Sequence, residues 1–85
     1  MTHPLSPAQI AAAVAWEDAQ NSQHVSSGIA ACGLLCSAFP DDEAIVLCAS
    51  RLLVLAVCEG GDPDGEASCQ MAQALADRGY EFPGG

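Results

Sequence analysis

Length, composition and charge limit this chain to one small, acidic domain. It has 85 residues, with eleven Asp and Glu against two Arg, no Lys and a formal net charge of −9 at pH 7, and a chain of this size supports a single hydrophobic core. Such a charge repels phosphate backbones and anionic membranes, so we exclude direct nucleic-acid and membrane binding and expect a basic protein partner, with solubility as the alternative role of the acids.

The first helix is predicted over residues 7–20. Ser6 stands at the N-cap position, Gln9 completes a capping box three residues later, and Pro7 suits the first helical position. Apolar residues at helical spacing follow, until a polar stretch after Gln20 ends the pattern.

The second helix is predicted over residues 23–38. Its apolar residues recur three or four positions apart and form one stripe, which consists of Val25, Ile29, Cys32, Cys36 and Phe39. Gly28 and Gly33 lie within the helix, where each costs up to about 1 kcal/mol relative to Ala. We expect close helix packing at both glycines as compensation, with a break near residues 26–28 as the alternative.

The third helix is predicted over residues 41–58, with Asp41 as its cap and Gly60 after its end. The acidic residues of its first turn suit the positive end of the helix dipole. Because this segment is apolar nearly all round, we expect the third helix to be central and the most buried of the four.

The fourth helix is predicted over residues 64–78, with Gly79 as a left-handed terminator. Its start at residues 63–67 repeats the pattern Pro-Asp-x-Glu-Ala of residues 40–44. The repeat indicates the same helix-start chemistry used twice, with a degenerate duplication of one helical unit as the alternative.

These helices and their short connections predict an all-α fold. No segment has the alternating pattern of a strand, so a small antiparallel up-down bundle of four helices is the simplest arrangement. We expect a single helical domain over residues 1–85, with short flexible ends at residues 1–5 and 80–85.

The bundle topology predicts an acidic pole, because the turn between the first two helices and the turn between the last two share one end. We expect this pole to bind the partner, together with a neighbouring Trp that suits the centre of a protein interface. The predicted site comprises Trp16, Glu17, Asp18, Glu59, Asp62, Asp64 and Glu66. Two alternatives stand beside it: acids at helix starts are ordinary partners of the helix dipole, and a lone Trp often fills the core of a small bundle.

The sequence offers little for catalysis or for metal binding. Cys32 and Cys36 lie one helical turn apart, but a closed zinc site needs four ligands, and neither thiol has basic neighbours that would activate it. Residues 62–73 lack the Gly and the Glu that a calcium loop needs at its sixth and twelfth positions. We therefore predict no enzyme activity, no metal and no cofactor, and we expect Gly84 and Gly85 to form a flexible tail rather than the end of a conjugated modifier.

The first residues, Met1–Leu5, lack the basic residues and apolar stretch of a secretory signal. We therefore expect a cytoplasmic protein whose five cysteines are reduced. The most apolar segment, Ala44–Cys58, is shorter than the about 20 residues of a membrane span.

Together these features predict a small cytoplasmic inhibitor or adaptor that docks through its acidic pole on a basic, nucleic-acid-handling protein. A phage or mobile-element inhibitor of a bacterial defence complex, of the anti-CRISPR kind, has this size, charge and lack of catalytic groups. The alternative is a secretion chaperone or structural subunit that holds a partner helix in an apolar groove around residues 41–58. A homodimer through the same helix is a further alternative, as is a zinc or thiol protein.

Overall fold

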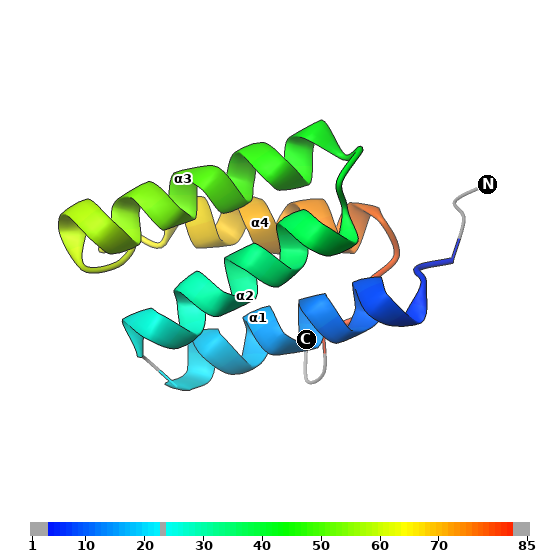
Figure 1. The fold of residues 1–85 in the computed structure, drawn as a ribbon, viewed down its shortest axis with the longest axis horizontal. Helices are drawn as coiled ribbons and strands as arrows, with labels where there is room; N and C mark the ends of the chain where they lie inside the picture. The colour runs from blue at the N-terminus through cyan, green and yellow to red at the C-terminus, as the bar shows by residue number, and fades with distance from the viewer. Residues whose placement is uncertain (1–3, 23, 83–85) are drawn as a thin grey trace.

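The computed structural model describes residues 4–22 and 24–82, which form a bundle of four helices (Figure 1). The helices are α1 (Pro7–Ser22), α2 (Val25–Ala38), α3 (Glu43–Glu59) and α4 (Glu66–Asp77). Each helix runs antiparallel to the one before it, and the described residues contain no strand. The predicted all-α fold is confirmed, whereas Gly84 and Gly85 lie outside the described residues.

The start of α1 is fixed by the predicted capping box. The backbone N–H of Ser6 donates to Gln9 Oε1 at 2.9 Å, and the backbone N–H of Gln9 donates to Ser6 Oγ at 3.2 Å. The Gln9 side chain also donates to the carbonyl oxygen of Ala38, the last residue of α2, at 3.2 Å. This bond joins α1 to α2 and satisfies a carbonyl that has no partner within its own helix.

The two Pro-Asp-x-Glu-Ala segments start their helices with different caps. Asp42, and not the predicted Asp41, is the N-cap of α3, and its side chain accepts a backbone N–H three residues later at 3.3 Å. The equivalent position before α4 is Gly65, which has no side chain that can cap. Asp62 takes this role, because its Oδ2 accepts the backbone N–H of Ser68 at 2.8 Å.

Glycines in the left-handed region end α3 and follow α4, as predicted. Gly60 has a φ of 74° and Gly79 a φ of 100°. A side chain disfavours this conformation, so glycine is the residue that stops a helix here at the lowest cost.

The core is built from all four helices. Its largest fully buried side chains are Leu35, Ile45, Met71 and Leu75. Each helix packs on the next one in the chain, α1 on α2, α2 on α3 and α3 on α4. Trp16 joins α1 to the same core, since it is only 3% exposed.

The segment that follows α4 is packed against the core as far as Phe82. The Phe82 ring lies edge-to-face on Trp16, with 6.3 Å between ring centroids, and on Tyr80, with 4.7 Å. Leu5 before α1 also packs on the core. Within the ends predicted to be flexible, residues 1–5 and 80–85, the bundle covers part of the apolar surface of Leu5, Tyr80 and Phe82.

α2 is one uninterrupted helix through Gly28 and Gly33, so the alternative of a break is excluded. A Cβ added at either glycine meets no described atom within 4 Å. The predicted close packing at these glycines is therefore wrong. Each glycine costs α2 up to about 1 kcal/mol relative to Ala, and no close packing offsets that cost.

α3 lies between α2 and α4, but it is not the most buried helix. Three of its seventeen residues are buried, whereas α4 buries four of its twelve. On the uncovered face, Leu47, Val54 and Val57 are 62%, 61% and 76% exposed. The sequence prediction fails because a small bundle covers one stripe of each helix, even where a helix is apolar on several sides. Within the described residues, no helix has the combined length and apolar character needed to cross a membrane.

Candidate functional site

The two turns predicted to form the acidic pole lie at the same end of the bundle (Figure 1). A hollow of about 180 Å³ separates them. It is lined by Trp16 and His24 near the α1–α2 turn, and by Gly60 and Asp62 in the α3–α4 turn. We call this region the turn end; its carboxylates are those of Asp18, Glu59, Asp62, Asp64 and Glu66.

Two of the turn-end acids already have partners within the chain. Asp62 is half-buried and caps α4, as described above. Glu66 lies 4.0 Å from Arg51 of α3, whose guanidinium also donates to Gln70 at 2.7 Å. Because Glu66 and Arg51 are both well exposed, their ion pair contributes little to stability.

The other turn-end acids, Asp18, Glu59 and Asp64, are exposed. The chain has only two arginines and no lysine, and both arginines are bonded to residues other than these three. Their carboxylates therefore face solvent without an Arg or Lys partner from the same chain.

Trp16 and Glu17 do not lie on the exposed surface that was predicted to include them. Trp16 is a core residue, which agrees with the alternative interpretation of a lone Trp. Glu17 is half-buried and accepts a hydrogen bond from the Tyr80 hydroxyl at 3.2 Å. Burial and this bond together raise the pKa of Tyr80. Glu17 thus holds the segment after α4 in place, a role that sequence reasoning missed because the two residues lie far apart in the chain.

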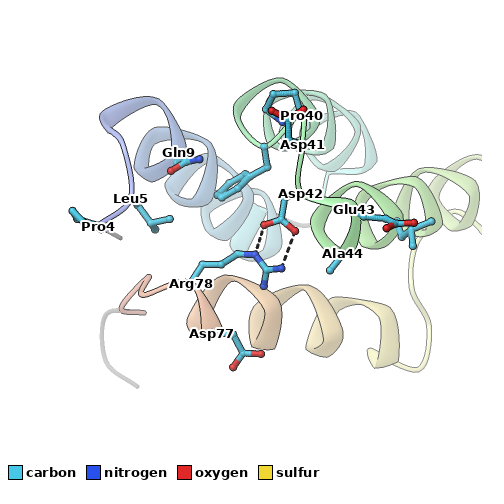
Figure 2. A pocket seen from close by; sticks show the side chains of 12 residues that line it. Pro4, Leu5, Gln9, Pro40, Asp41, Asp42, Glu43, Ala44, Asp77 and Arg78 are labelled. Carbon is cyan, nitrogen blue, oxygen red and sulfur yellow. Dashed lines mark hydrogen bonds and ion pairs between the residues drawn. The ribbon is translucent and has the colours of Figure 1, made fainter. Parts of the chain in front are cut away.

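The opposite end of the bundle holds a larger, open hollow of about 850 Å³ (Figure 2). Arg78, just after α4, donates to both carboxylate oxygens of Asp42 at the start of α3, with 2.8 Å between Nη2 and Oδ1. Its Nη1 also donates to the Ala74 carbonyl oxygen at 2.7 Å. The bond to Arg78 holds the pKa of Asp42 below its ordinary value. Arg78 and Asp42 therefore tie α4 to α3 at this end.

Acidic residues gather at both ends of the bundle rather than at one. The opposite end carries Asp41, Asp42, Glu43, Asp77 and Glu81. Between the two ends the helices are almost free of charge, and α2 has no charged residue at all. The number of acidic residues therefore does not distinguish the turn end from the opposite end. The two ends differ in how their acidic side chains are bonded to the rest of the chain.

The most exposed apolar surface lies on α3 and is not part of the predicted site. Leu47, Ser50, Val54 and Val57 are all exposed and recur three or four residues apart, which is the spacing of helix-pairing surfaces. The same spacing is visible in the sequence. Because apolar residues also occupy the other sides of this helix, the sequence predicts a buried helix, with pairing to a second copy as the alternative, and does not single out this face.

Thiols and metal ligands give no second candidate site. Burial, followed by the neighbouring Cys36, raises the pKa of Cys32 to about 11, so its thiol is protonated near neutral pH and unreactive. All five cysteines are free. Among the residues that the structure describes, no three His, Cys, Asp or Glu side chains come together in a way that could hold a metal ion.

Comparison with protein-family models, with curated proteins and with solved structures finds no match to this chain. Its function is therefore argued from its own surface. The two features available are the exposed acids of the turn end and the apolar face of α3.

Proposed function

We propose that this chain is a protein-binding inhibitor or adaptor that docks on a basic protein. The observation that carries the proposal is that both arginines are already bonded within the chain, Arg51 to Gln70 and Arg78 to Asp42. With a net charge of −9 and no lysine, the exposed Asp18, Glu59 and Asp64 have no Arg or Lys partner in the chain. A basic surface supplies the missing cations, and long-range attraction also speeds the encounter.

A partner that handles nucleic acid has the required surface, because it already presents Lys and Arg side chains to phosphates. An acidic protein docked on that surface competes with the nucleic acid for the same cations. A phage or mobile-element inhibitor of a bacterial defence complex, of the anti-CRISPR kind, is one class of protein that works in this way, and we advance it by analogy of size and charge. We place the docking site at the turn end, where Asp18, Glu59 and Asp64 are exposed.

The proposal is tested by capturing proteins from a nuclease-treated lysate of the organism that encodes the chain. We expect basic, nucleic-acid-handling proteins to be retained at about 0.05 M salt and released at about 0.5 M, where exposed charges are screened. The proposal fails if no basic protein is retained at low salt.

Two charge-reversed variants locate the docking site. Asp18→Lys/Asp64→Lys removes exposed acids from the turn end, and Asp77→Lys/Glu81→Lys makes the same change of charge at the opposite end. We expect the first variant to lose the partner at low salt and the second to keep it. Equal losses in the two variants would exclude the turn end as the docking site.

A secretion chaperone or structural subunit is the second candidate function. The exposed Leu47, Val54 and Val57 on α3 favour it. Such a protein keeps its partner at high salt, because apolar contacts are not screened, and loses it when Leu47 and Val54 are replaced by polar residues.

A further inference from the structure

The segment that follows α4 turns back toward α1 and is held there by two side chains (Figure 1). We call residues 79–82 the strap. The Tyr80 hydroxyl donates to Glu17 of α1 at 3.2 Å. Two residues later, the Phe82 ring lies edge-to-face on Trp16, with 6.3 Å between ring centroids. The strap therefore covers two residues of the site that the sequence predicts for the partner.

The strap is fastened less firmly than the helices that it joins. Among the described residues, the last backbone hydrogen bond along the chain runs from the Tyr80 N–H to the Leu75 carbonyl oxygen at 3.1 Å. An open hollow of about 530 Å³ lies between the strap and the start of α1, where Leu5 and Ile10 line it. The helices pack in chain order, so opening the strap breaks none of their pairings. Segments with so few buried contacts are those that open ahead of global unfolding.

Closure of the strap leaves Trp16 with an unsatisfied polar group. Its Nε1 is buried and has no hydrogen-bond partner within the part of the chain that the structure describes. A buried donor without a partner disfavours the state that buries it, and water supplies a partner once the ring is uncovered. Trp16 also lines the hollow of the turn end. Movement of Phe82 away from the indole therefore uncovers an aromatic surface beside the docking site.

The closed strap shows which contacts the surface beneath it accepts. One side chain donates a hydrogen bond to Glu17, and a second, two residues later, packs an apolar ring on Trp16. Lys or Arg in the first position makes a charge-assisted bond to the carboxylate, which is stronger than the bond from a neutral hydroxyl. Both arginines of the chain are bonded elsewhere, so such a cation comes from a partner.

We infer that the strap is a displaceable cover, and that the surface beneath it binds a segment of the partner with Lys or Arg at one position and an apolar side chain two residues away. The cation pairs with Glu17, and the apolar side chain replaces Phe82 on Trp16. The inference rests on the proposed function for the presence of a basic partner. It adds Trp16 and Glu17 to the docking site as residues that become accessible when the strap opens.

Hydrogen exchange of the Trp16 indole N–H, followed by NMR on the full chain, tests whether the strap opens by itself. The chain has a single Trp and this N–H has no hydrogen bond, so its exchange reports burial at one place. We expect its protection factor to be at least about tenfold lower than that of the Leu35 amide in the core, and to change less in dilute urea, because local opening exposes little surface. Equal protection and equal urea dependence would overturn the inference.

Variants at Tyr80 test which charge the surface accepts, with the strap as a probe at high local concentration. Tyr80→Gln and Tyr80→Arg both remove the aromatic ring and differ in charge. We expect the indole protection factor to be at least about threefold higher in Tyr80→Arg, because the guanidinium pairs with Glu17. Adding Glu17→Gln to both variants is expected to remove this difference. Equal protection in the Arg and Gln variants, or a difference that persists without the Glu17 carboxylate, would contradict a cation-binding surface.

Releasing the strap tests its effect on the partner. Tyr80→Ala/Phe82→Ala removes both contacts, and Glu81→Gln is the matched control on the same segment, since Glu81 is exposed. A closed strap lowers the apparent affinity, so we expect the released variant to bind the captured basic protein at least about tenfold more tightly than the wild type, and the control to stay within about threefold. Circular dichroism establishes that both variants are folded.

Failure of this inference is distinct from failure of the proposed function. If a basic protein is captured and the released variant binds it no more tightly than the wild type, the proposed function stands and the inference falls. If the lysate yields no basic protein while indole exchange and the Tyr80 variants behave as expected, the displaceable strap and its cation-binding surface stand and the proposed function falls.

Discussion

The two ends of the bundle carry similar numbers of acidic residues, but the structure uses them differently. At the opposite end, polar side chains join residues far apart in the chain, Gln9 with Ala38 and Arg78 with Asp42. At the turn end, Asp62 caps the helix that follows it, and the contact between Glu66 of α4 and Arg51 of α3 is an exposed ion pair at 4.0 Å. Polar residues at the opposite end thus fasten helices together, whereas most turn-end acids have no tertiary role and remain available to a partner.

The largest effect on stability is expected from Arg78→Met at the opposite end. The substitution removes hydrogen bonds to Asp42 and to the Ala74 carbonyl, and it leaves a carboxylate that is only 24% exposed without its cation. We expect the free energy of unfolding, measured with urea, to fall by about 1–2 kcal/mol. Arg51→Met is the matched control, with an expected change below about 0.5 kcal/mol because its ion pair is exposed. Equal losses in the two variants would show that the opposite end is not held by Arg78.

The second-largest effect is expected from acid, which weakens the bond between Asp42 and Arg78 at the opposite end. The pKa of Asp42 lies below its ordinary value of 3.8 in the folded protein, chiefly because Arg78 bonds to it. The ionised carboxylate therefore stabilises the fold above about pH 4, and this contribution is lost as the pH falls through the lower, folded pKa. We expect the free energy of unfolding to fall less steeply below pH 4 in Asp42→Asn than in the wild type. Parallel curves for Asp42→Asn and the wild type would contradict the assignment.

The smallest effect is expected from neutralising the exposed acids of the turn end. Glu59→Gln/Asp64→Asn is expected to leave the free energy of unfolding within about 0.5 kcal/mol of wild type. Glu59 stands in the last turn of α3, where a negative charge opposes the helix dipole, so its loss slightly favours the helix. A loss above about 1 kcal/mol in thermal or urea unfolding would assign these acids a structural role instead.

The parts of the fold that could be predicted from sequence are those decided by neighbouring residues. Ser6 and Gln9 cap each other across three positions, and Gly60 and Gly79 stop helices through their own backbone conformation. The number and order of the helices follow from such local chemistry. The position of the two turns at one end follows in turn from antiparallel packing with short connections.

The sequence could not predict which polar residues are already bonded within the chain, because those bonds join distant parts of it. The pairing of Asp42 with Arg78 spans 36 positions, and that of Glu17 with Tyr80 spans 63. Trp16 has acidic neighbours in the sequence, but packing against Phe82 buries it. The apolar composition of α3 indicated burial, yet which of its faces is covered depends on where α2 and α4 lie.

The salt dependence of partner affinity tests the role of the turn end most directly. The dissociation constant of a captured basic protein is measured from about 0.05 to 0.5 M salt for the wild type, Asp18→Lys/Asp64→Lys and Asp77→Lys/Glu81→Lys. We predict that the turn-end variant weakens binding and flattens its dependence on salt, while the variant at the opposite end keeps both near wild type. Equal weakening and equal slopes in the two variants would contradict a docking site at the turn end.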